Sequence, residues 1–375
     1  MLHYSFSTVL MTVLTSNIII VLIALCFQHK KILLSIGYKL LIVFLILTFA
    51  RFLFPFELPF SRNVILPEFL SAIISYFLHA FYNQNDIRIS LWTVFKFIWI
   101  VGILYKLGKY IYQYISTERH IIMWSIDVTE EEPYKTILSD ICKKHKNRFR
   151  VLKVPGVTVP CLYGLFKPRI LIPAEIELSK TDLYFTLRHE ISHHYHRDLW
   201  VKRLVSFLGI IYWWNPACSK LRTQTDLLLE MRIDDSLVKG DPQAIKAYLR
   251  TLTHIVDSAV TISTLPASLL VSMAQKNPEV LVKRFEMMSH EKDRASIPLS
   301  ILLCAVVLSL CLGSYLFTFE NFYAVESNVD GTFDAKDGVY VVPREDGKYD
   351  IYYGDSLLEV IDSMEFYSDV PIITK

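Results

Sequence analysis

Four long apolar stretches constrain the fold of this 375-residue chain more than any other feature. They cover residues 5–27, 32–54, 90–113 and 297–319. Each is close to the roughly 20 apolar residues that a helix needs to cross a bilayer. The composition fits this interpretation, since 53% of the residues are hydrophobic and only 20% are charged. We therefore predict an α-helical polytopic membrane protein with four transmembrane helices.

Basic residues beside these stretches indicate how the chain crosses the membrane. They are Lys30, Lys31, Lys106, Lys109, Arg119, Lys283, Arg284, Lys292 and Arg294. Because Lys and Arg are enriched on the cytoplasmic side, we expect residues 114–296 in the cytoplasm and the 55–89 loop outside. In a bacterial-type plasma membrane, both termini would then be extracellular. Arg284 and the 292–294 segment are interpreted as a basic membrane flank, and the basic cluster at 143–150 as a contact for anionic lipid.

Three further segments have apolar or alternating patterns. Residues 64–82 hold Pro67 and Glu68 near their start, so a surface-lying or re-entrant helix is favoured over a span. The 199–214 run is short and charged, which favours a buried or membrane-interface helix. In the tail, two alternating runs flank an Asp-Gly pair, which predicts a β-hairpin. Residues 320–375 are expected to form a small β-rich extracellular module that binds an unknown ligand.

The segment most informative about chemistry contains His189-Glu190-x-x-His193. Residues i and i+4 share one face of a helix, so both imidazoles can bind one Zn²⁺ while Glu190 stands beside it. A helix is expected here, because residues 182–188 contain no Gly or Pro and follow the candidate N-caps Ser179 and Thr181. The alternative, a solvated helical face, is disfavoured by the spacing. We predict one zinc ion per chain.

A catalytic zinc site has three protein ligands and one open position, so a third ligand is required. The Trp214-Asn-Pro216 sequence begins a predicted helix, whose later part carries Asp226, Glu230 and Asp234 on one face. Helical spacing does not choose among these three carboxylates, although Asp234 could support a ligand at Glu230. Asp198 is expected to support a ligand imidazole or brace the helix. The remaining histidines near the motif, with His254, are interpreted as surface or core residues.

These residues make the chain similar to the BlaR/MecR-type membrane zinc metallopeptidases, the β-lactam-sensing antirepressors and their wider family. The similarity rests on Pro160-x-x-x-Gly164-x-x-x-Pro168-x-Ile170-x-x-Pro173, Arg188-His-Glu-x-x-His193 with Asp198, Trp214-Asn-Pro216, Glu230-x-x-x-Asp234 and Val282-Lys-Arg-Phe285. It implies a mainly α (α+β) gluzincin-like domain over residues 114–296 and Glu230 as the third ligand. It also implies that a substrate peptide lies alongside an edge strand formed by Arg169, Ile170, Leu171, Ile172 and Pro173.

The chain departs from the family pattern in two places. Lys202 stands where the family often has Asn, which we interpret as a minor change. The tail after residue 319 is too short for the penicillin-binding domain of the β-lactam receptors and has no Ser-x-x-Lys. Sensing of β-lactams is therefore not expected.

The resemblance implies a zinc endopeptidase in which the metal lowers the pKa of its water and polarises the scissile carbonyl. Glu190 would act as general base and then as proton donor. The substrate would be a cytoplasmic winged-helix repressor, with self-cleavage between residue 285 and the fourth span. The net charge of +2 does not favour direct binding of nucleic acid.

Two alternatives remain open. One is a housekeeping quality-control protease similar to the prenyl-protein and heat-shock membrane zinc peptidases, and the other is a non-catalytic receptor with structural zinc. The oligomeric state is also open, a homodimer included.

Overall fold

The computed structural model describes residues 6–55, 61–78, 80–84, 87–142, 149–238, 241–262, 283–284, 288, 297–320, 339–344, 348–353 and 356–361. The chain divides into two compact units, one of residues 1–64 and 76–320 and the other of residues 65–75 and 321–375. Most of the basic cluster predicted at 143–150 lies outside the described residues. So does the segment predicted for self-cleavage, apart from Met288.

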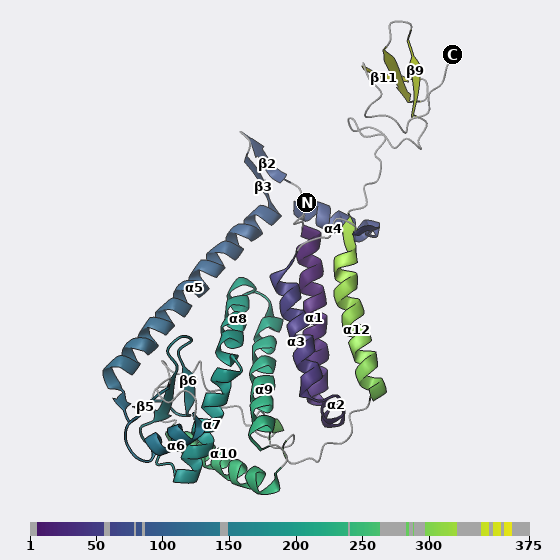
Figure 1. The fold of residues 1–375 in the computed structure, drawn as a ribbon. Helices are drawn as coiled ribbons and strands as arrows, with labels where there is room; N and C mark the ends of the chain where they lie inside the picture. The colour runs from purple at the N-terminus through teal and green to yellow at the C-terminus, as the bar shows by residue number, and fades with distance from the viewer. Residues whose placement is uncertain are drawn as a thin grey trace. The chain divides into compact units, whose positions relative to one another are not determined.

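Three long helices of the first unit pack side by side (Figure 1). They are α1 (Phe6–Gln28), α3 (Tyr38–Leu53) and α12 (Ile297–Leu316). One continuous apolar core joins them to α8 (Asp198–Ile211) and α9 (Pro216–Val238). Polar side chains add specific bonds to this core, because Asn215 donates to Asn17 at 2.9 Å and Gln224 donates to the Ile20 carbonyl at 3.0 Å. Helix α9 is therefore fixed to the apolar bundle.

The prediction of one continuous helix over residues 32–54 is wrong. The segment forms α2 (Lys30–Ile36) and α3, which are separated at Gly37 with φ 76° and ψ 155°. This backbone conformation is accessible to Gly but strained for other residues, so the helix breaks there. The 16 residues of α3 rise about 24 Å, less than the thickness of a hydrocarbon core. Within the part of the chain that the structure describes, the helices long and apolar enough to cross a membrane are Ser7–Gln28, Leu91–Trp124 and Pro298–Leu316.

Helix α5 (Leu91–Trp124) is longer than predicted and continues to Trp124 instead of ending near residue 113. Its N-cap is Ser90, whose hydroxyl accepts from the Thr93 amide at 3.2 Å. Most of its large apolar side chains are exposed, as expected for a helix that faces lipid. Its contact with α8 runs through tryptophans, since the Trp99 indole N–H donates to the Ile211 carbonyl at 2.5 Å.

A four-stranded sheet forms the β part of the first unit. Its strands are β4 (Ile126–Asp127), β5 (Arg150–Val154), β6 (Cys161–Tyr163) and β7 (Arg169–Pro173), in the order β4-β5-β7-β6. Strand β7 pairs in parallel with β5 and antiparallel with β6. The prediction that β7 is the edge strand is therefore wrong, because β5 pairs along its whole length and β6 pairs with its first three residues, Arg169 to Leu171. Strand β6 lies at the edge of this sheet.

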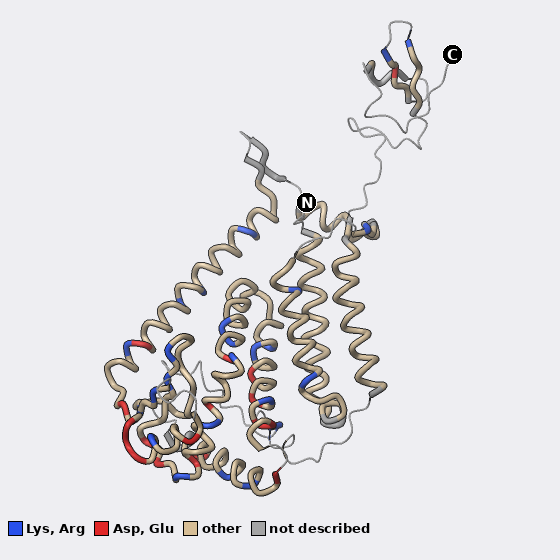
Figure 2. Tube along the Cα trace, viewed as in Figure 1, with Lys and Arg blue, Asp and Glu red and all other residues tan. Residues whose placement is uncertain are grey.

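Five helices follow or cover the sheet. They are α6 (Tyr134–Ile141), α7 (Lys180–Tyr195), α10 (Pro242–Ile262) and the two helices α8 and α9 already described, with α6 and α7 sharing an apolar core with the sheet. The predicted start of α7 is confirmed, since Ser179 caps it by accepting from the Asp182 amide at 3.1 Å. Pro216 begins α9 as predicted, and Asn215 accepts from the Ala217 amide at 3.0 Å. Charged residues gather in this part of the chain and are sparse on α1, α3 and α12 (Figure 2).

The loop before α5 contains β1 (Arg62–Ile65), α4 (Glu68–Leu78), β2 (Ala80–Gln84) and β3 (Ile87–Ser90). The helix predicted over residues 64–82 is therefore shorter than expected. Strand β1 pairs with β8 (Phe317–Glu320), and β2 pairs with β3.

In the second unit, three strands form an antiparallel sheet in the order β11-β10-β9. They are β9 (Val339–Pro343), β10 (Tyr349–Tyr353) and β11 (Ser356–Ile361). The hairpin predicted in the tail corresponds to the pairing of β9 with β10, in which Tyr349 lies opposite Pro343. The stacked rings of Tyr340 and Tyr352, with centroids 5.4 Å apart, lie on one face of this pair.

Candidate metal centre

The His-Glu-x-x-His motif lies in the last two turns of α7, where the helix is buried. His189, Glu190 and His193 are all less than one tenth exposed. The rings of His189 and His193 have centroids 4.7 Å apart, and their Nε2 atoms are separated by 3.0 Å. The i, i+4 spacing therefore turns one nitrogen of each imidazole toward the same point, as the motif predicted.

Glu230 approaches this point from α9. Its Oε2 atom lies 3.1 Å from His189 Nε2, and its Oε1 atom lies 3.5 Å from His193 Nε2. Ligand atoms of the three residues all lie within 4.8 Å of one another, a group that could hold a metal ion. Of the three carboxylates that helical spacing left open, the structure brings Glu230 into the cluster. Asp226 and Asp234 do not belong to it.

Asp198 orients His193 from the start of α8. It is fully buried and accepts a hydrogen bond from His193 Nδ1 at 2.7 Å. Its other oxygen contacts the Arg232 guanidinium. Because Nδ1 carries the hydrogen of this bond, Nε2 is the nitrogen that faces the cluster and that can bind a metal once its own proton is lost. Asp198 thus occupies the supporting position that the sequence predicted.

Tyr248 of α10 plays the corresponding part for His189. Its hydroxyl donates to Asp234 Oδ1 at 2.7 Å and lies 2.7 Å from His189 Nδ1, from which it can accept. Asp234 therefore acts on His189 through Tyr248, since its own Oδ1 is 3.8 Å from that nitrogen. Tyr248 is not among the residues predicted from the sequence. No spacing signal connects it to the motif, because α10 reaches α7 only by packing.

The charges in the cluster shift its protonation. Burial alone lowers the pKa of His193, but Glu230 and Asp198 outweigh burial and raise it to about 9. Burial likewise raises the pKa of Glu230, yet His193 and Arg284 hold that pKa well below its usual range. In the protein without metal, Glu230 is therefore ionised near neutral pH, and His193 is a positively charged imidazolium with a proton on both ring nitrogens. A metal ion entering the cluster must displace the proton on Nε2.

Lys202, interpreted from the sequence as a minor departure, lies at the cluster. Its ammonium is 3.7 Å from Glu230 Oε1 and 4.0 Å from Asp226 Oδ1. Burial lowers the pKa of Lys202, but the nearby carboxylates, Glu230 first, outweigh burial, so the pKa is raised above its usual value. Lys202 is therefore a cation at the site, in a place where an Asn would be neutral.

The edge strand β6 lies near Glu190. Burial and then the charge of Glu190 raise the pKa of Cys161 to about 12, which reflects the proximity of this strand to α7. In contrast, Arg169 of β7 pairs with Glu118 at 2.6 Å, and Ile170, Leu171 and Ile172 are buried in the core. These side chains therefore belong to the core, and the edge strands of this sheet are β4 and β6.

The histidines excluded from the predicted site lie elsewhere. His194 packs edge-to-face on Phe149, His196 bonds the Ser192 carbonyl, and His254 pairs with Asp182. None of the three belongs to the described metal-binding group.

The interpretation of Arg284 as a membrane flank is wrong. Its guanidinium is 13% exposed and forms a two-bonded ion pair with Asp234. The physical reason is that Asp234 is buried and ionisable, and a buried carboxylate needs a hydrogen-bonded cation.

Comparison with known proteins agrees with this arrangement. The model of the family described as BlaR1 peptidase M56 matches residues 7–288. The chain belongs to the BlaR1 peptidase M56 family. This confirms the resemblance inferred from the motifs, and it identifies the protein as a membrane protein of a peptidase family whose site contains a cluster suited to a metal ion.

A curated relative of this M56 protein is the regulatory protein BlaR1 of Bacillus licheniformis. The two are 21% identical over 227 residues, which is 60% of this chain and 37% of the relative. The chain therefore spans little more than a third of the length of the relative it matches.

Proposed function

We propose that this M56 protein is a membrane-embedded zinc endopeptidase that cleaves a cytoplasmic protein in response to an extracellular signal. One observation carries the proposal. Two imidazole nitrogens and the Glu230 carboxylate converge beside Glu190, and each imidazole is held at its other nitrogen by a separate partner. A solvated helical face would have neither the convergence nor the support.

The donor set fits zinc. Two histidine nitrogens and one carboxylate oxygen form a three-ligand set of the kind that leaves a coordination position open in catalytic sites. His189, His193 and Glu230 would hold the ion, which when bound supplies a Lewis acid for a peptide carbonyl and lowers the pKa of water.

The chain's own residues divide the remaining tasks. Glu190 is the proposed proton carrier, taking a proton from the attacking water and giving it to the leaving amide nitrogen. Asp198 and Tyr248 keep the two imidazoles in the orientation in which Nε2 faces the cluster. The open edge of β6 can add an extended peptide as a further strand, with backbone hydrogen bonds supplying sequence-independent affinity.

The proposed substrate is a cytoplasmic winged-helix repressor, and cleavage would relieve repression. Support comes from the motif resemblance and from the relative, which is named a regulatory protein. The β9–β11 sheet is the proposed extracellular sensor. Self-cleavage between residue 285 and the fourth span, and an arrangement with both termini outside and the protease domain inside, belong to the same proposal.

The test is a comparison of new protein N-termini in cells that express the wild type or Glu190→Gln at matched membrane levels, with the zinc content of each purified protein. We expect one Glu190-dependent cut in a DNA-binding repressor and equal zinc content. Scattered Glu190-dependent cuts in membrane proteins would favour a quality-control protease instead. Full cleavage by Glu190→Gln would contradict the role of Glu190, and zinc binding without any cleavage would favour a non-catalytic receptor.

A further inference from the structure

Arg284 reaches the candidate metal centre from a part of the chain that carries none of its ligands. Its Nε donates to Asp234 Oδ2 at 2.8 Å, and its Nη2 donates to Asp234 Oδ1 at 2.8 Å. Two parallel hydrogen bonds from a guanidinium to one carboxylate are stronger than neutral hydrogen bonds and fix the relative orientation of the two groups. The Asp234 side chain is 2% exposed, so the pair is shielded from water.

The same guanidinium also contacts a candidate metal ligand. Its Nη1 lies 3.4 Å from Glu230 Oε2, the oxygen that lies 3.1 Å from His189 Nε2. Its Nη2 is 3.3 Å from the Tyr248 hydroxyl. One side chain therefore touches Glu230 directly and His189 through Tyr248.

The contacts of Arg284 offset the repulsion between two carboxylates on α9. Glu230 and Asp234 are one helical turn apart, and two ionised carboxylates at this spacing repel each other. Repulsion is stronger in a buried site than in water. A guanidinium that bonds both carboxylates removes the repulsion and fixes their separation. Lys202 neutralises Glu230 from the opposite side, at Oε1, and is not paired with Asp234 in the described contacts.

The segment that carries Arg284 is itself attached to the protease core. Met288, four residues later, is buried in a cluster that includes Phe185, Ile233 and Tyr248. The neighbouring Lys283 points elsewhere, with its ammonium 5.9 Å from the Phe27 ring of α1. Arg284 and Lys283 are thus adjacent and both positively charged, but they have different neighbours, so Lys283 can serve as a matched control.

We propose that Arg284 is a positioning residue of the metal centre, which clamps Asp234 to Glu230 and so fixes the Glu230 carboxylate and the Tyr248–His189 bond. This inference rests on one part of the proposed function, namely that the cluster of His189, His193 and Glu230 binds a metal ion. It does not require that any peptide is cleaved.

The experiment uses the full-length protein in detergent, with zinc and cobalt ions as the probes. Zinc affinity is measured by competition with a chelator, and the visible absorption of the cobalt-loaded protein reports ligand geometry. We expect Arg284→Met to weaken zinc binding about 10- to 100-fold and to alter the cobalt spectrum. Arg284→Lys keeps the positive charge and should recover only part of the affinity. A single ammonium cannot make two parallel bonds to Asp234 and also reach Glu230. The control Lys283→Met should keep the affinity and spectrum of the wild type.

A purely structural role predicts a different result. In that case Arg284→Met would lower the thermal midpoint of the metal-free protein, while the folded fraction would bind zinc with unchanged affinity and spectrum. That outcome would overturn the proposal. Should Arg284→Met fail to fold, Arg284→Lys and Asp234→Asn complete a double-mutant cycle on zinc affinity. Non-additive losses support the clamp and additive losses overturn it.

The two proposals can fail separately. Wild-type protein that binds zinc but cleaves nothing would refute the peptidase and leave the Arg284 result standing. Unchanged zinc affinity in Arg284→Met would refute the clamp and leave the peptidase standing. A wild type that binds no zinc would refute both.

Discussion

The replacement Tyr248→Phe removes one buried hydroxyl from the candidate metal centre and leaves the ring in place. The ring packs against Phe185 with centroids 5.6 Å apart, and phenylalanine can keep this contact. The hydroxyl lies 2.7 Å from both His189 Nδ1 and Asp234 Oδ1. Asp234 keeps its two bonds from Arg284 in the variant, so the residue that loses most is His189.

The size of the effect follows from the state of His189. A buried donor without an acceptor costs about 1–3 kcal/mol. Without metal, the imidazole can rotate and relieve part of this cost. Once Nε2 binds a metal, the ring is fixed and Nδ1 stays unsatisfied, so the penalty falls on the metal-bound state. We therefore expect zinc affinity to fall about 10- to 100-fold, which is the usual range for loss of a partner that orients a ligand.

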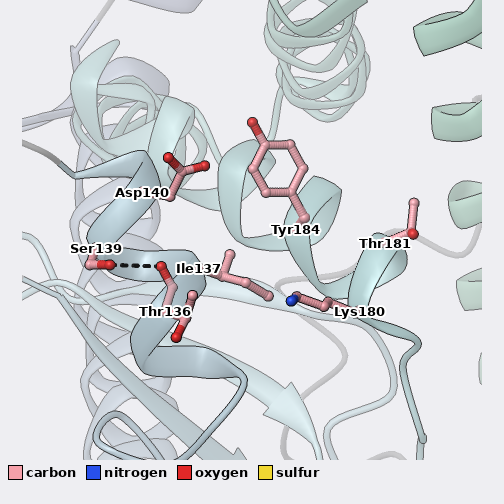
Figure 3. Close-up of a pocket in the computed structure, with 7 residues that line it drawn as sticks. All are labelled: Thr136, Ile137, Ser139, Asp140, Lys180, Thr181 and Tyr184. Carbon is pink, nitrogen blue, oxygen red and sulfur yellow. Dashed lines mark hydrogen bonds between the residues drawn. The ribbon is translucent and has the colours of Figure 1, made fainter.

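Chelator competition on the purified protein measures this change. The matched control is Tyr184→Phe, since Tyr184 is also on the protease core but lines an open surface pocket with residues of α6 (Figure 3). Unchanged zinc affinity in Tyr248→Phe would refute the argument that Tyr248 orients His189. An equal loss in Tyr184→Phe would attribute the effect to general loosening of the domain.

Two further predictions concern packing and protonation. A Cβ atom at Gly102 would overlap the Trp213 indole, whereas one at Gly108 would meet nothing within 4 Å. Gly102→Ala should therefore lower the thermal midpoint in detergent, at a cost of about 1–3 kcal/mol. Gly108→Ala should leave the midpoint unchanged or raise it. Equal midpoints would contradict the packing of α5 against Trp213. The pKa of His193 is raised from 6.5 to about 9 in the metal-free protein, so its proton stabilises the fold fully below pH 6.5 and this stabilisation is lost as the pH rises through 9. Zinc binding near neutral pH should therefore release a proton and strengthen with rising pH up to about 9, and the absence of proton release in weakly buffered solution would contradict this.

Residue spacing along the chain was enough to predict the features that depend on one helix at a time. The helix through His189 and His193 and the start of α9 at Pro216 follow from a repeat of 3.6 residues per turn and from capping preferences, which also limited the cap of α7 to Ser179 or Thr181. The same repeat placed Asp226, Glu230 and Asp234 on one face, but it could not say which of them meets the two imidazoles. That depends on how far α9 is rotated and shifted against α7.

The remaining features depend on contacts between segments far apart in the chain. The place of β7 inside the sheet results from pairing on both of its edges, which an apolar run such as Ile170–Ile172 does not reveal. Tyr248 and Arg284 reach the metal centre from α10 and from the segment before α12, at sequence distances with no fixed spacing. Local spacing therefore predicted the two histidines and the helix that carries them. The packing of α7 against α9 and α10 selected Glu230 and supplied its supporting residues, because burial leaves each charged group dependent on whichever partner the fold places beside it.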